Sequence, residues 1–142
     1  MKNTFVLLFA LIANILMAQT ATKEQILSEL PELEITKDVN LHIISPEPIL
    51  YVDLSTQQLT GDLPTTNIAR IKISDNIPAD SKEKTKTPNS FSNGSTVGII
   101  TVVGQSFIAQ YKAVYRNSEN RNIATNIHIQ PEAMQPIEFN KM

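Results

Sequence analysis

The feature that most constrains this chain is the two-residue alternation of apolar and polar side chains that begins near residue 33. Short runs with this alternation are rich in β-branched residues, and clusters of proline, glycine, asparagine or serine separate them. Because successive side chains of a strand point to opposite faces of a sheet, the pattern is typical of half-buried strands. The sequence therefore predicts an all-β fold of about seven short strands, either an antiparallel β-sandwich or a partly open barrel.

The predicted strands have polar connections between them, and their ranges are 33–36, 39–44, 49–55, 67–74, 97–103, 106–115 and 122–130. The clearest feature is the hairpin over 97–115, whose turn we expect at Gly104-Gln105. Its second strand has large or small apolar residues on one face, namely Phe107, Ala109, Tyr111, Ala113 and Tyr115. Pro46 and Pro48 interrupt the ladder before the third strand, because proline has no N–H to donate.

Residues 67–74 and 56–66 show two contrasting patterns, one of a half-buried strand and one of a turn. In the strand 67–74, Ile68, Ile71 and Ile73 are expected to be buried, with Arg70 and Lys72 facing outward. Residues 56–66 are polar and predict a turn.

The flanks of the predicted β domain, which spans 33–116, differ from it in composition. Of the first 18 residues, 14 are apolar, and Lys2 lies at their start, so 1–18 is expected to be a signal peptide cleaved after Ala18. Residues 19–32 form a leader with a short helical turn that Pro31 stops. The polar stretch 76–96 predicts a flexible loop within the domain, and 117–142 predicts a possible last strand followed by a loosely held tail.

Composition excludes several classes of protein. The chain has no cysteine, so disulfides, thiolate zinc sites and cysteine nucleophiles are excluded, and packing alone must stabilise the fold. Without Lys2 it carries 11 basic and 14 acidic residues, and it has no tryptophan. Negative net charge and scarce aromatic residues argue against direct nucleic-acid binding.

The residues suited to catalysis are few. His42 and His128 lie in alternating strands, where an exposed structural histidine is the expected interpretation, and Asp53 and Asp62 are the only carboxylate pair considered for hydrolysis. Asp62 lies in Gly-Asp-Leu-Pro, a sequence that favours a turn. No spacing of ligands predicts a metal site. We therefore expect no enzyme activity and no cofactor.

The segment 41–55, LHIISPEPILYVDLS, resembles the signature of the conjugative transposon protein TraN family of Bacteroidetes. Pro48-Ile49 and Tyr51-Val52-Asp53 match that signature, while Ser45-Pro46 replaces its Phe-Pro. Further similarities follow in order at Asn67, Ala69, Arg70, Ile71 and Lys72, and in the hairpin from Gly98 to Tyr115. The resemblance covers about residues 33–116. Family members continue into a second β domain, so the chain is expected to correspond to the N-terminal domain only.

The resemblance implies a non-catalytic assembly subunit of a conjugative type IV secretion apparatus. Such a subunit would be exported to the periplasm and would associate with the outer membrane through other conjugation proteins, in an oligomeric ring. The candidate interface residues are Pro46, Pro48, Tyr51 and Asp53. The proline break is expected to expose a strand edge, and Tyr51 is either an interface anchor or a core residue. The alternative is a free-standing secreted β-sandwich that binds a glycan, peptide or surface protein through the loop around Lys82–Lys86.

Overall fold

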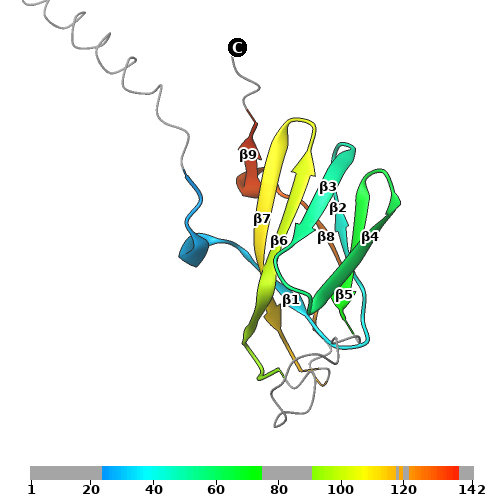
Figure 1. Ribbon diagram of the computed structural model, residues 1–142, viewed down its shortest axis with the longest axis vertical. Coiled ribbons are helices and arrows are strands. Elements are labelled where there is room, and N and C mark those ends of the chain that lie inside the picture. Colours follow the sequence, from blue (N-terminus) through cyan, green and yellow to red (C-terminus); the bar gives the residue numbers. More distant parts are fainter. Residues whose placement is uncertain (1–23, 75–90, 118, 120–121, 138–142) are drawn as a thin grey trace, which may run out of the picture.

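The structure is a computed structural model that describes residues 24–74, 91–117, 119 and 122–137. These residues form two β-sheets that pack against each other (Figure 1), so the β-sandwich is confirmed in preference to a partly open barrel. The predicted signal peptide and residues 76–90 of the predicted loop, with its three lysines, lie outside the described residues. In the part of the chain that is described, no helix is long and apolar enough to span a membrane.

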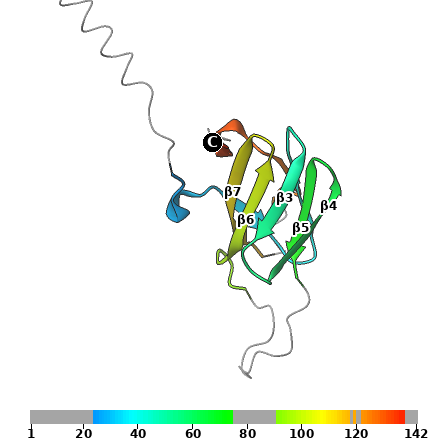
Figure 2. The same cartoon turned by 45° about the horizontal axis from the view of Figure 1, so that its top comes forward.

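The first sheet has the strand order β1-β7-β6-β3, and β9 pairs with the other half of the same β7 edge that β1 occupies. Neighbouring strands in this sheet are antiparallel, except β1 and β7, which are parallel. Figure 2 shows β7, β6 and β3 side by side across this layer. The strands are β1 (Glu32–Ile35), β3 (Ile49–Leu54), β6 (Thr96–Gly104), β7 (Phe107–Tyr115) and β9 (Met134–Pro136).

The second sheet has the order β4-β5-β2-β8, in which β2 and β8 are parallel and the other pairs antiparallel. Its strands are β2 (Leu41–Ile44), β4 (Leu59–Thr65), β5 (Ile68–Ile73) and β8 (Asn126–His128). Two 3₁₀ turns complete the described secondary structure: η1 (Leu27–Glu29) in the predicted leader, and η2 (Pro131–Ala133) between β8 and β9.

The expectation of purely antiparallel sheets was wrong, because each sheet contains one parallel pair. Both parallel pairs form where the chain crosses between the sheets. After β1 the chain passes to β2 in the opposite sheet, so β1 takes β7 as its neighbour instead of its sequential successor. Such long-range pairing leaves no local signal in the sequence.

The expected number of about seven strands was low, since the described residues contain nine. The turn predicted over 56–66 is the strand β4, in which Leu59 is the buried residue and the remaining six are exposed. An edge strand with one solvated face needs few apolar residues, and it tolerates Pro64 where the register with β5 shifts between Asp62 and Thr65. Because β4 is mostly polar, its sequence has no apolar alternation that would predict a strand.

The C-terminal segment contains more structure than a loose tail. The last strand predicted within 122–130 is present as β8. After η2 the chain returns to the first sheet, where β9 pairs with the start of β7 through Phe107↔Pro136 and Ala109↔Met134. Ile137 N also donates to Ser106 O at 2.9 Å. The last described residues are thus held by backbone hydrogen bonds.

The end of the predicted loop also belongs to the fold. Gly94 N donates to Tyr115 O at 2.8 Å, and Tyr115 N donates to Ser95 O at 2.9 Å. Phe91 packs against the core, with its ring centroid 5.6 Å from that of Tyr115. Gly94 and Ser95 therefore continue the pairing of β6 with β7 beyond its last regular pair, Thr96↔Val114.

The core lies between the sheets and is built from β-branched side chains. The most deeply buried are Ile35, Ile43, Ile71, Ile100 and Val102. On β7 the expected inward face is confirmed, with Tyr115 only partly buried. On β5 the buried residues are Ala69, Ile71 and Ile73, and Ile68 lies on the opposite face, because residues two apart share a face of a strand.

We predict that Ile43→Ala lowers the free energy of unfolding by about 2–5 kcal/mol, since it removes a fully buried side chain and leaves a cavity. Leu50→Ala, a matched truncation of a side chain that is 56% exposed, should change it by less than about 0.5 kcal/mol. Urea denaturation followed by circular dichroism measures both. Equal effects of the two substitutions would contradict the assigned core.

Candidate protein interface

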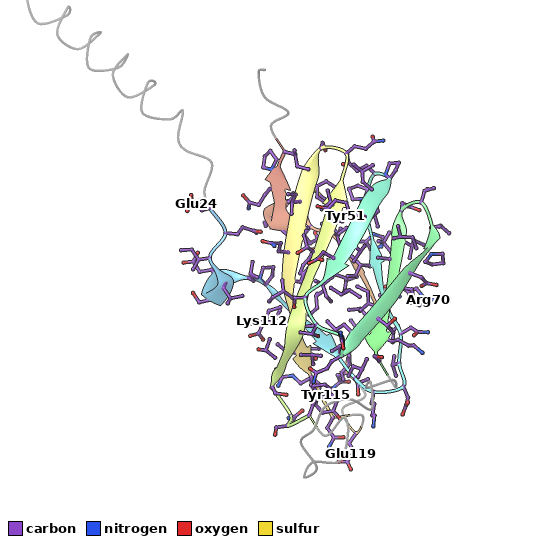
Figure 3. All side chains as sticks on the ribbon, in the orientation of Figure 1. Glu24, Tyr51, Arg70, Lys112, Tyr115 and Glu119 are labelled. Atoms are coloured by element: carbon purple, nitrogen blue, oxygen red, sulfur yellow. The ribbon has the colours of Figure 1, made fainter. Side chains whose placement is uncertain are left out.

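Tyr51 and Asp53 lie on the outer face of the first sheet, at its β3 edge. Tyr51 pairs with Val103 and Asp53 with Thr101, whereas the next position in register, Val102, points into the core. Tyr51 is 56% exposed (Figure 3), so the interpretation of this residue as core was wrong. An exposed tyrosine that combines an apolar ring with a hydroxyl is suited to anchor a protein contact.

A β-bulge places a second large apolar side chain beside Tyr51. Ile49 pairs with Gly104 and Tyr51 with Val103, so Leu50 is the extra residue of β3. Ile49 is buried, while Leu50 is 56% exposed. Leu50 and Tyr51 are therefore adjacent, solvent-exposed and on an edge strand.

A row of residues across the first sheet continues this apolar surface. The strand registers place Val103 beside Tyr51, Ile108 beside Val103, and Gln135 of β9 beside Ile108. Val103 is buried although it is on the outer face, and Ile108 is half-buried. We call the surface formed by Leu50, Tyr51, Val103 and Ile108 the outer strip. It joins apolar atoms from three neighbouring strands.

Pro46 and Pro48 are exposed, and Glu47 between them fixes the turn of the β6–β7 hairpin. The Glu47 carboxylate accepts hydrogen bonds from Ser106 N at 2.7 Å and Ser106 Oγ at 2.9 Å. The hydrogen bond from the Ser106 backbone is the main reason that the pKa of Glu47 is lowered. A side chain at Gly104 would meet Glu47 Oε1 at 2.6 Å, so glycine there allows this contact.

The proline break does not free the strand edge at the start of β3. Ile49 N donates to Thr66 O at 2.7 Å, and Ser45 N donates to Asn67 O at 2.8 Å. The segment thus joins the β4–β5 turn in the other sheet. The break is therefore covered at Ile49, while the rest of β3 forms an edge of the first sheet.

The outer face of the second sheet is polar around Arg70. Arg70 Nε donates to Asp62 Oδ1 at 2.9 Å, and a second contact joins the same guanidinium and carboxylate. The hydrogen bond from Arg70 lowers the pKa of Asp62 and, in return, raises that of Arg70. A depression of about 390 Å³ surrounds this pair, with Asn40, Thr60 and Lys72 on its walls. Exposed ion pairs of this kind contribute little to stability.

The structure separates Asp53 from Asp62, the two carboxylates that could form a catalytic pair, and places His42 and Asp62 on either side of Arg70. His42 pairs with Arg70 on the outer face of the second sheet, whereas Asp53 is on the outer face of the first. Asp62 pairs with Arg70, and His128 lies on the edge strand β8. Among the described residues no three His, Cys, Asp or Glu side chains form a group that would hold a metal ion.

Two features of this surface were missed from the sequence. The bulge has a signal in retrospect, because the consecutive apolar residues Ile49, Leu50 and Tyr51 cannot all fit one face of a regular strand. The contact of Glu47 with Ser106 has no signal in the sequence, since 59 residues separate the two partners.

No family model matches the chain, and no curated protein is significantly similar to it. The candidate interface is therefore defined by the exposure and geometry of its own residues.

We predict that the contribution of Glu47 to stability depends on pH. Its folded-state pKa is lowered, so the stabilisation is present above the ordinary pKa of a glutamate and is lost as pH falls through the folded value. Glu47→Gln should therefore lower the urea midpoint at pH 7, and the difference from wild type should shrink towards pH 3.

The matched control for this measurement is Glu119→Gln, because Glu119 is an exposed glutamate away from the hairpin turn (Figure 3). It should leave the urea midpoint unchanged at both pH values. A difference between wild type and Glu47→Gln that stays constant from pH 7 to pH 3 would show that charge is not what stabilises the contact.

Proposed function

We propose that the protein is a non-catalytic structural subunit of a conjugative type IV secretion apparatus, exported to the periplasm and associated with the outer membrane through partner proteins. The observation that carries the proposal is the outer strip, where Leu50 and Tyr51 are each 56% exposed side by side. Large apolar side chains gathered on one face of a soluble fold mark a contact surface. The resemblance of segment 41–55 to the TraN family supplies the biological context.

The outer strip has the composition expected of a protein contact. Tyr51 supplies an aromatic anchor, Val103 and Ile108 supply an apolar centre, and the Asp53 carboxylate lies at the margin of the same face. Contact energy concentrates on such central anchors, while polar groups at the margin favour correct partners. In the proposed mechanism, neighbouring subunits of a ring cover the strip, and the sandwich acts as a rigid support.

A second candidate function is a secreted β-sandwich that recognises a polar ligand, such as a glycan, peptide or surface protein. The depression around Asp62 and Arg70 favours it, because its walls present amide, hydroxyl and charged groups. Arg70→Ala discriminates between the candidates. It should abolish ligand recognition under the second and leave assembly intact under the first.

The proposal is tested in cells that carry the complete transfer system. The protein should fractionate with the outer membrane in a high-mass complex. Tyr51→Asp should weaken this assembly by about 30-fold or more, because loss of an interface anchor costs about 2 kcal/mol or more. Conjugation frequency should fall with it, while the unfolding midpoint of the purified variant stays within the range expected of a surface substitution.

Leu63→Asp is the matched control, since Leu63 is another exposed apolar residue on a strand, 40% exposed, but in the second sheet. It should leave both fractionation and conjugation unchanged. A soluble monomer in these cells, or normal conjugation with Tyr51→Asp, would overturn the proposed function.

A further inference from the structure

A groove opens between the two sheets on the side of the sandwich away from β3. It has a volume of about 650 Å³ and lies between the edge strands β1 and β8. Leu33 of β1, Tyr111 of β7, Ile127 of β8 and Ala133 of η2 give it an apolar lining. The groove does not include any residue of the outer strip.

Tyr111 places a polar atom in this apolar groove. Its side chain is only 4% exposed, and burial raises its pKa to about 12, so the phenol is a neutral hydrogen-bond donor over the physiological range. Among the described residues no group forms a hydrogen bond with the hydroxyl. The hydroxyl oxygen is not among the buried polar atoms that lack a partner, so it reaches the solvent of the groove, where a ligand carbonyl would accept its hydrogen bond in place of water.

The strand beside the groove also has backbone groups available. His42 N donates to Thr125 O at 2.9 Å, and Ile129 N donates to Ile44 O at 2.9 Å. This parallel register directs the backbone of Ile127 towards β2, so the N–H groups of Asn126 and His128 face the open edge. An edge of this kind accepts an additional strand.

The margin of the groove is acidic. Glu132 lines the groove and also an adjoining hollow that contains Glu24. No lysine or arginine is among the described residues that line either hollow. The apolar floor thus has carboxylates at its margin, and this charge pattern is complementary to a cationic ligand.

From these observations we propose that the groove binds an extended, basic segment of a partner protein. The segment adds as a strand beside β8, and an apolar side chain enters between the sheets above Tyr111 and Ala133. One of its carbonyl groups accepts the Tyr111 hydroxyl hydrogen bond, and flanking lysine or arginine residues lie near Glu132 and Glu24. This site is separate from the outer strip and does not depend on the assembly function.

The test uses three synthetic peptides and the purified protein. The first has the sequence Lys-Lys-Val-Leu-Val-Lys-Lys, the second replaces each lysine by glutamate, and the third replaces the central leucine by proline. Binding is followed by backbone amide NMR titration in low salt. The lysine peptide should bind and shift the amide signals of Asn126 and His128, the glutamate peptide should not bind, and the proline peptide should bind at least tenfold more weakly.

Two substitutions examine the contacts in the groove. Tyr111→Phe keeps the ring and removes the hydroxyl, and it should weaken the lysine peptide about fivefold. Glu132→Lys should weaken it about five- to tenfold, and this loss should shrink in high salt. Glu119→Lys makes the same charge change at the far end of the molecule (Figure 3) and should have little effect.

Several results would overturn the proposal. They are no binding of the lysine peptide at millimolar concentration, equal binding of the lysine and glutamate peptides, or shifts confined to residues outside the groove. Equal losses with Glu132→Lys and Glu119→Lys would also overturn it, since binding would then follow net charge alone. Amide spectra of each variant that match the wild type away from the substitution establish that the variants are folded.

Discussion

The strand β7 is the constraint on which the first sheet depends, because both of its edges carry backbone hydrogen bonds along their length. One edge pairs with β6 throughout, and the other is divided between β1 and β9. The segments that enter and leave the domain therefore meet on the same strand. In a chain without cysteine, hydrogen bonding to this shared strand holds the first and last strands of the described residues in one sheet.

The same arrangement explains which parts of the fold were predictable from sequence. The β6–β7 hairpin is local, and its inward residues Phe107, Ala109 and Tyr111 alternate without interruption, so its strands and their buried face were predicted. β4 and β9 bury too few apolar residues to alternate visibly. The partners of β1 and β8 are set by crossings between the sheets, which a strand pattern does not encode.

The candidate surfaces were predictable only in part, for a related physical reason. Tyr51 was identified as a candidate from its sequence context, but its exposure depends on the bulge at Leu50, which changes the face of one residue relative to the next. The groove was not identified at all. Leu33, Tyr111 and Ile127 come from three distant segments, and each one alone has the pattern of an ordinary core residue.

The positions of the two surfaces bear on how the protein would assemble. The outer strip begins at β3, one edge of the first sheet, and the groove opens at the opposite edge beside β1. A single self-complementary face closes a pair of subunits, whereas two unlike faces on opposite sides let one molecule contact two different neighbours at once. Because the strip is apolar and the groove is bordered by carboxylates, the two proposed contacts would select partners of different chemistry. A small sandwich of this kind would therefore link an apolar contact on one side to a basic segment on the other through a rigid core.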